Sequence, residues 1–366
     1  MCVDSAYFDF SKAFDSVRHD LLIQKLSSVG LSGPLLTWII DYLKNRTQVV
    51  NIRGFLSTER QVSSGVIQGS VLGPIFFIIY YVDDVDLYDK KLCHFYIRIY
   101  RCYKSDTASQ RENDILFQND INGINSWSQK WDLKFNISKC CVLYFGRSNT
   151  KSQYSINDSQ LKISHQEKDL GVLFSAKFKF NDHMDAMIRK ANRQLGIISK
   201  VFKQKNPQTI IPLYKSFVRP FLEFNSIIWS PYTKTYIQKI EKIQEKMCNS
   251  MCVSRSLTYQ EKLTKLKMHS LRARRIKQQL TFMFKMKNKF VDLCFDNFFQ
   301  NNSYRKTRGH VFKLLFPKSK TKYRLNFFTC SIIKHWNQLK STDINVRTIS
   351  LFKKKIDHYF KRANIW

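Results

Sequence analysis

An acid in an apolar stretch and a glycine-bearing loop are the features of this sequence that could do chemistry. Asp9 interrupts the apolar run at residues 6–10, which is typical of a strand buried on both faces. A buried carboxylate costs several kcal/mol unless a cation or hydrogen bonds compensate it, so Asp9 needs a partner. In the loop at residues 64–70, Gly65 and Gly69 would let the backbone approach a ligand closely. We therefore expect both segments to belong to a functional site.

The charge of the chain indicates a polyanionic partner. The 366 residues include 61 Lys and Arg against 28 Asp and Glu, which gives a net charge of +33, and 43% are hydrophobic. A globular protein with this excess repels itself unless it meets a polyanion. A basic protein that needs only solubility, or one that docks on an anionic membrane, is the alternative. The basic residues run through the whole chain, which favours nucleic acid.

Hydropathy and cysteine content predict an intracellular protein without a membrane segment. The apolar run at residues 75–82 is too short for a bilayer, which takes about 20 residues, and no apolar leader follows Met1. The nine Cys lack the spacing of a disulfide framework, which fits a reducing compartment. We interpret Cys248 and Cys252 as helix residues rather than metal ligands. We expect a cytoplasmic and nuclear location.

The elements that must position the site follow from periodicity. Helices are expected around residues 21–26 and 32–43, and Trp127 and Trp131 share the apolar face of a further helix. From about residue 180 helical patterns dominate, and they include residues 184–202, 207–229 and 237–247. Strands are expected at residues 6–10, 49–52, 60–62, 134–136, 141–145 and 170–174. A mixed segment followed by helices predicts an α+β fold.

The segment Phe8-Asp9-Phe10-Ser11-Lys12-Ala13-Phe14-Asp15-Ser16-Val17 resembles motif A of reverse transcriptases from non-LTR, LINE-type retrotransposons, especially jockey-like ones. The resemblance implies that Asp9 binds the two catalytic metals, Mg²⁺ or Mn²⁺. It also implies that Phe14 lies under the sugar of the incoming nucleotide, with Phe10 in the same nucleotide-binding site. Asp15 carries no such role and is interpreted as structural.

Further segments resemble the same family in family order. Residues 64–74 are similar to motif B, in which Gly65, Gln68 and Gly69 would contact the template base and the nascent pair. Residues 133–140 are similar to motif D, whose lysine, here Lys139, would protonate the pyrophosphate leaving group. Residues 168–172 resemble the primer grip, with Leu170 and Gly171. The similarity continues at residues 213–220, 229–232, 308–310, 326–328 and 336–337.

The paired acids of motif C are missing where the resemblance requires them. Asp83 and Asp84 follow Gln68 by only 15 and 16 residues, too few for a helix and a returning strand. Anchors at residues 92 and 99–101 instead align Phe95 and Tyr96 with the two acids. Neither side chain ligates magnesium as a carboxylate does, and we therefore expect a catalytically defective copy.

We expect a right-hand polymerase palm that lacks complete fingers, at residues 1–178, in an N-terminally truncated copy. A helical thumb at residues 179–260 and a basic, mostly helical region at residues 261–366 would follow. RNA template and DNA primer or target are the expected partners, and the oligomeric state stays open. The alternatives are an active nucleotidyltransferase that uses Asp9 with Asp83 or Asp84, and a non-catalytic nucleic-acid-binding protein derived from a retroelement and adopted by its host.

Overall fold

The computed structural model describes residues 2–82, 98–103, 110–146, 149–251, 256–301 and 311–365. Two compact units make up the chain: the first unit is Met1–Asp169 with Leu173–Lys179, and the second unit is Leu170–Val172 with Phe180–Trp366. Within the described ranges, no helix is both long enough and apolar enough to cross a membrane.

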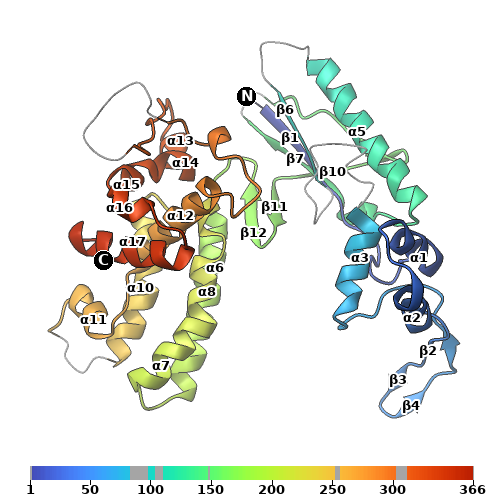
Figure 1. Cartoon of the computed structure of the whole chain (residues 1–366), viewed down its shortest axis with the longest axis horizontal. Coiled ribbons are helices and arrows are strands. Elements are labelled where there is room, and N and C mark those ends of the chain that lie inside the picture. The colour runs from blue at the N-terminus through green and yellow to red at the C-terminus, as the bar shows by residue number, and fades with distance from the viewer. Residues whose placement is uncertain are drawn as a thin grey trace. The chain divides into compact units, whose positions relative to one another are not determined.

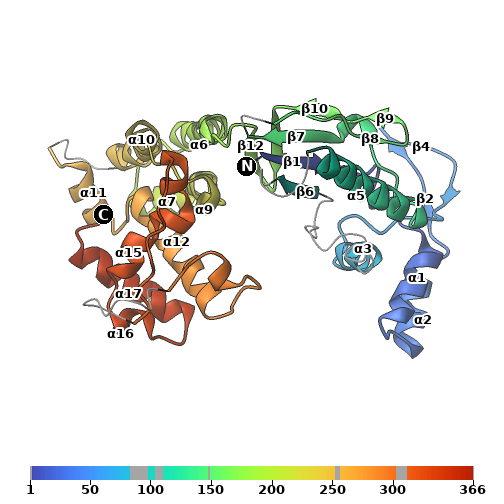
Figure 2. The same ribbon diagram turned by 90° about the horizontal axis from the view of Figure 1, so that it is seen from above.

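The first unit is built on one sheet and a long helix. These are β1 (Cys2–Tyr7), β6 (Arg98–Tyr103), β7 (Cys141–Phe145), β10 (Lys162–Ser164) and α5 (Gln110–Lys130). The strand order is β10-β7-β1-β6, in which β1 runs antiparallel to both neighbours and β10 runs parallel to β7 (Figure 1). Ala6 is the register partner of Ile99 on one side and of Val142 on the other. The helix α5 lies along one face of this sheet (Figure 2).

Helical spacing places the apolar stripe of α5 in the core of the first unit. Phe117, Ile121 and Ile124 are fully buried, and Trp127 and Trp131 are 1% and 9% exposed. The prediction that both Trp residues belong to the core is confirmed. Burying side chains of this size contributes about 1.5–3 kcal/mol each relative to exposure.

Shorter elements complete the first unit. They are α1 (His19–Ser28), α2 (Gly33–Leu43), β2 (Thr47–Gln48), β3 (Asn51–Ile52), β4 (Phe55–Leu56), β5 (Arg60–Gln61), α3 (Leu72–Val82), η1 (Ile137–Lys139), β8 (Ser155–Ile156), β9 (Ser159–Gln160), β11 (Gln166–Asp169) and β12 (Val172–Ser175). The α3 helix begins where Ser70 Oγ accepts a hydrogen bond from Gly73 N at 2.9 Å. It contains the apolar run at residues 75–82, and Phe76 and Tyr80 on it are buried in the core.

The strands expected at residues 49–52 and 60–62 are present in part, as β3 and β5. They do not pair with each other: β3 pairs with β4, and β2 pairs with β5. Arg53 and Gly54 both have positive φ, +52° and +92°, which is the geometry of a tight two-residue hairpin turn. Residues 134–136 form no strand, because only Phe135 makes an isolated bridge, to Phe10.

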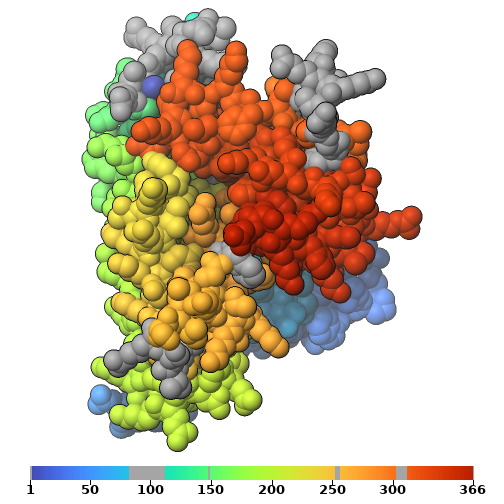
Figure 3. Space-filling view, turned by 90° about the vertical axis from the view of Figure 1, so that its left-hand side faces the viewer, coloured from blue at the N-terminus to red at the C-terminus, as the bar shows by residue number. Residues whose placement is uncertain are grey.

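Helices form the second unit. They are α6 (Asn181–Val201), α7 (Pro207–Leu213), η2 (Tyr214–Val218), α8 (Arg219–Glu223), α9 (Ser226–Trp229), α10 (Lys234–Met251), α11 (Tyr259–Lys265), α12 (Leu271–Lys287), η3 (Phe295–Asn297), α13 (Lys322–Asn326), α14 (Phe328–Ser331), α15 (Ile333–Asn337), α16 (Ser341–Ile344) and α17 (Ile349–Arg362). Figure 3 shows a face of this unit formed by α10 and α11 (yellow to gold) and by the C-terminal helices (red). Trp336 and Phe352 are fully buried between α12 and those helices.

The single helix expected at residues 207–229 is divided into four pieces. Pro212 stands inside the first piece and has no N–H for the helical ladder, and the π-helical turn η2 follows directly. Asn225 then adopts a left-handed conformation with φ of +50°, which separates α8 from α9. The apolar periodicity is helical throughout this range, so it did not show the breaks, although Pro212 is a signal in the sequence for the first of them.

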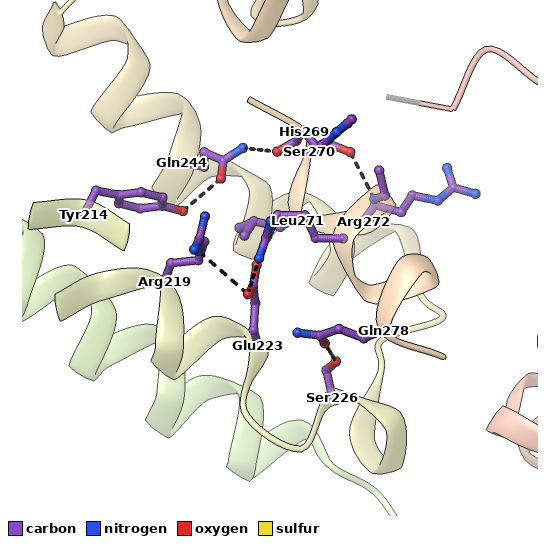
Figure 4. Close-up of polar contacts among 12 residues, drawn as sticks. Tyr214, Arg219, Glu223, Ser226, Gln244, His269, Ser270, Leu271, Arg272 and Gln278 are labelled. Atoms are coloured by element: carbon purple, nitrogen blue, oxygen red, sulfur yellow. Dashed lines mark hydrogen bonds and ion pairs between the residues drawn. The ribbon is translucent and has the colours of Figure 1, made fainter. Parts of the chain in front are cut away.

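Polar contacts tie η2 and α10 to the start of α12 (Figure 4). Gln244 accepts a hydrogen bond from Tyr214 Oη at 3.0 Å and donates one to His269 O at 3.0 Å. Glu241 accepts from the backbone N–H groups of Leu271 and Arg272 at 3.2 and 2.6 Å. A carboxylate on the N-terminal N–H groups of a helix stabilises that helix, so these contacts fix where α12 begins.

Candidate functional site

Asp9 lies just beyond the end of β1, beside the segment that carries Lys139. Asp9 O accepts a hydrogen bond from Asn136 N at 2.8 Å, and this backbone contact holds the two segments together. The Asp9 side chain is 45% exposed, and its Oδ2 lies 3.2 Å from Lys139 Nζ. The structure therefore brings together the two residues to which the family resemblance gives catalytic roles.

The buried strand expected at residues 6–10 lies earlier in the chain, at Cys2–Tyr7. The strand ends at Tyr7, and the buried carboxylate belongs to Asp4, which is 1% exposed. Asp4 accepts hydrogen bonds from Asn149 Nδ2 and Tyr154 Oη, both at 2.6 Å. These bonds compensate the burial of Asp4. Because Asp9 is half-exposed, it carries no such penalty and needs no cation to offset it.

The backbone around Phe14 is held to the glycine loop. Val66 N donates to Phe14 O at 2.9 Å, and Gly65 N donates to Val17 O at 2.7 Å. The side-chain amide of Gln68 donates to Asp15 Oδ1 at 2.9 Å. The residues that the resemblance assigns to the nucleotide site therefore come together from segments about fifty residues apart, and Asp15 serves as a structural anchor for the loop.

Gly65 is required by its place in this contact. Its φ is +94°, and a Cβ added there would lie 3.0 Å from the Cα of Asp15 and 3.1 Å from its carbonyl oxygen. Gly69 has a φ of +86°, but no atom lies within 4 Å of an added Cβ. Glycine is therefore needed at position 65 because the backbone of Asp15 lies too close for a side chain, and at position 69 because of the positive φ alone.

The two aromatic residues of the site have different surroundings. Phe14 stacks on Phe77 of α3, with ring centroids 4.7 Å apart. Phe10 stacks on Phe135 at 5.1 Å and meets Tyr81 edge-on at 5.6 Å. Both rings are partly buried against the core of the first unit. These contacts hold each ring in one orientation. A binding site beside Asp9 and the glycine loop would require rings with fixed positions.

Leu170 and Gly171 form the turn between β11 and β12 and belong to the second unit. Both have positive φ, +43° and +86°. Asn225 Nδ2 donates to Leu170 O at 3.2 Å, and a Cβ on Gly171 would lie 2.9 Å from the ring of Phe224. The strand expected at residues 170–174 therefore begins only at Val172.

The described residues do not fit a site for two divalent cations. They contain no group of three or more His, Cys, Asp or Glu side chains that could hold a metal ion. Asp9 already has Lys139 as a partner, and one carboxylate offers too little negative charge for two divalent ions. Asp83, Asp84, Phe95 and Tyr96 lie outside the described residues.

Two further residues, which the sequence predictions left without a catalytic or binding role, lie near this site. His19 is buried, and its Nε2 lies 2.8 Å from Gly65 O. Cys140 Sγ lies 3.9 Å from Asp9 O, and burial raises the pKa of this thiol, which favours the neutral form over a metal-binding thiolate. His19 is the first residue of α1, two positions after the motif A segment, and its polar character at that place was the available signal.

The chain has measurable likeness to known proteins. The family described as reverse transcriptase (RNA-dependent DNA polymerase) matches residues 5–180. The RNA-directed DNA polymerase from mobile element jockey of Drosophila melanogaster is 24% identical over 260 residues, which cover 66% of this chain and 27% of that protein. The probable RNA-directed DNA polymerase from transposon X-element of the same species is 26% identical over 253 residues, which cover 67% and 28%.

The solved structure of a telomerase from Candida tropicalis, in complex with a fragment of telomeric RNA, is similar at 12% identity and a TM-score of 0.35. The aligned part covers 73% of this chain and 49% of the telomerase chain. That likeness is too low to support an argument about fold. The chain spans little more than a quarter of the length of the two mobile-element relatives. Residues 5–180 therefore carry a reverse transcriptase domain, and the chain is similar over two thirds of its length to the RNA-directed DNA polymerases of non-LTR mobile elements.

Proposed function

We propose that this chain is a nucleic-acid-binding reverse transcriptase domain that has lost polymerase activity. The observation that supports this most directly is the ion pair of Asp9, whose carboxylate Oδ2 lies 3.2 Å from Lys139 Nζ, so that a cation already faces the acid of the motif A segment. The alignment of Phe95 and Tyr96 with the paired acids of the family agrees with it. Each 1.36 kcal/mol of lost transition-state stabilisation lowers the rate tenfold, so the loss of two metal-binding acids would abolish measurable turnover.

The proposed architecture follows the family. The sheet and α5 at residues 1–178 would be the palm, and the helices at residues 179–260 the thumb. Residues 261–366 would add a basic C-terminal region. RNA template and DNA primer or target are the proposed partners, because the net charge of +33 favours a polyanion. We further propose that the protein acts in the cytoplasm and nucleus.

Primer extension on an RNA template tests the loss of activity. The wild-type chain, with Mg²⁺ or Mn²⁺ supplied, should give no more product than the Asp9→Ala variant. Extension by the wild type that Asp9→Ala abolishes would overturn the proposal. If Asp83→Ala abolished it as well, Asp83 would be one of the missing acids.

Binding is tested separately, with the full chain and an RNA–DNA duplex. The apparent affinity should fall steeply between about 50 and 200 mM salt, because phosphate contacts release counterions. A flat salt response, or no binding at low salt, would contradict the nucleic-acid part of the proposal and leave the catalytic part untouched.

A further inference from the structure

A basic cleft lies in the second unit, between the α8–α9 turn and α12. Its volume is about 720 Å³. Arg219 and Glu223 of α8 and Ser226 of α9 lie on one side, and Gln278 of α12 lies on the other (Figure 4). None of these residues belongs to the site that the family resemblance predicts.

Cations dominate the lining of the cleft. Glu223 is the only acid among the described residues that line it. Six basic side chains line it: Lys215, Arg219, Arg274, Lys277, Lys285 and Lys353. Such an excess in a concave surface concentrates positive potential and selects an anionic ligand.

Three of the six cations are already engaged. Arg274 makes two hydrogen bonds to Glu223, one of them from Nη2 at 2.9 Å, and Arg219 Nε lies 3.7 Å from the same carboxylate. Lys277 Nζ lies 2.5 Å from Asp357 Oδ1. No carboxylate among the described residues pairs with Lys215, Lys285 or Lys353, which come from η2, α12 and α17. Three lysines on three elements therefore converge on one cleft without an internal counter-charge.

The cleft also has an exposed aromatic ring. Phe224 is 57% exposed at the rim, and Ile227 and Phe282 add apolar lining. Asn225 donates to Leu170 O, and the ring of Phe224 packs against Gly171, so the Leu170–Gly171 turn supports this rim. An aromatic face beside several separated cations suits a base that stacks while neighbouring phosphates are neutralised. A free phosphate or an acidic peptide would not use the ring.

We infer that this cleft binds single-stranded nucleic acid, with a base on Phe224 and backbone phosphates on Lys215, Lys285 and Lys353. The inference rests on the proposed function, because it assumes that the chain binds nucleic acid. It goes further by naming the surface and the strand type. A base inside a duplex is paired and stacked on its neighbours, so its faces do not reach Phe224, and the cleft should prefer unpaired strands.

Fluorescence anisotropy of the full chain with labelled single-stranded RNA and DNA, and with an RNA–DNA duplex, tests this inference. A variant with Lys215→Gln, Lys285→Gln and Lys353→Gln should bind single strands at least about tenfold more weakly. Its salt dependence should be shallower by about 2 in log–log slope, because each lost phosphate contact removes about 0.7 for a single strand. The matched control is Lys242→Gln, Lys265→Gln and Lys334→Gln, which removes the same charge from exposed positions of the second unit outside the cleft.

The ring has its own test. Phe224→Leu should weaken single-strand binding about tenfold with an unchanged salt slope, and Phe224→Tyr should keep it. Circular dichroism melting of each variant reports whether the fold is intact. If the cleft and control triple variants lose affinity equally, or if the cleft variant loses duplex affinity as much as single-strand affinity, the inference is wrong while the proposed function stands. If the wild-type chain binds no nucleic acid, both are wrong.

Discussion

Lys139 Nζ lies 3.2 Å from Asp9 Oδ2, so the acid of the motif A segment has a lysine as its partner. Both side chains are largely exposed, 65% for Lys139 and 45% for Asp9. Solvent screens a pair of this kind, which contributes about 0–1 kcal/mol. We predict that Asp9→Asn and Lys139→Met each change the free energy of unfolding by less than about 1 kcal/mol. Urea denaturation of both single variants and the double variant measures this, and a coupling energy above about 2 kcal/mol would contradict it.

Replacing three glycines by alanine distinguishes the stability cost of a positive φ from the cost of a steric contact. Gly65→Ala should destabilise the first unit by about 2 kcal/mol or more, because its Cβ meets the backbone of Asp15 and its φ is positive. Gly69→Ala has the same unfavourable φ but open space, so about 1 kcal/mol is expected.

Gly196 of α6 provides the control, because it has helical backbone and no atom lies near an added Cβ. Gly196→Ala should stabilise the protein by about 0.5–1 kcal/mol, since alanine is the better helix former. Chemical denaturation of the three variants gives the order. Equal losses for Gly65→Ala and Gly69→Ala would show that contact with Asp15 contributes nothing.

Replacing either of two adjacent arginines of α12 by methionine should change the stability of the protein in opposite directions. Arg275 is 2% exposed, and among the described residues neither of its terminal nitrogens has a hydrogen-bond partner. Burial lowers the pKa of its guanidinium. Arg275→Met keeps most of the volume and should be neutral or stabilise by about 1 kcal/mol. Arg274→Met should destabilise by about 2–4 kcal/mol, because the carboxylate of Glu223, which is 10% exposed, then keeps just the longer contact to Arg219 among the described residues. Thermal melting of both variants checks the contrast, and a clear loss in Arg275→Met would refute it.

The acid stability of the second unit should depend on His335. Burial, together with the charges of Arg272 and Lys334, lowers the pKa of His335 to about 4. The imidazole is therefore neutral in the folded state at pH 5, while the unfolded chain takes up a proton near pH 6.5. Stability linked to this group is complete above pH 6.5 and is lost as the pH falls toward 4.

Between pH 7 and pH 5 the wild type should lose about 1–2 kcal/mol more unfolding free energy than His335→Gln does. Tyr359 Oη donates to Gln338, so His335 Nδ1 donates to Tyr359 Oη at 3.0 Å, and a Gln amide can replace this contact. Urea titrations of both proteins at the two pH values decide the matter. Parallel losses in the two would assign the acid sensitivity to another group.

Local patterns predicted the elements that depend on neighbours in sequence. The strand at Cys141–Phe145 has the predicted limits, and the 3-and-4 spacing placed Trp127 and Trp131 in the core. Helices at residues 33–43 and 181–201 lie close to their expected ranges. In each case the apolar side of the element is set by residues within a few positions of one another.

Features that depend on distant partners were out of reach. Asp4 can be buried because Asn149 and Tyr154, about 150 residues later, supply its hydrogen bonds, and the sequence therefore pointed to Asp9 instead. The cleft in the second unit was missed for the same reason. Lys215, Lys285 and Lys353 are spread over three helical segments, and only packing brings them together.

The turn at Leu170–Gly171 has a consequence for where the chain can be cut. The chain enters the second unit at Leu170, returns to the first at Leu173 and leaves it again after Lys179. A break after residue 178, where the predicted palm ends, would leave the fully buried Val172 on the wrong piece. The boundary between the units is therefore not a single point in the sequence, and a fragment produced by one cut at this place would lack residues of its own unit.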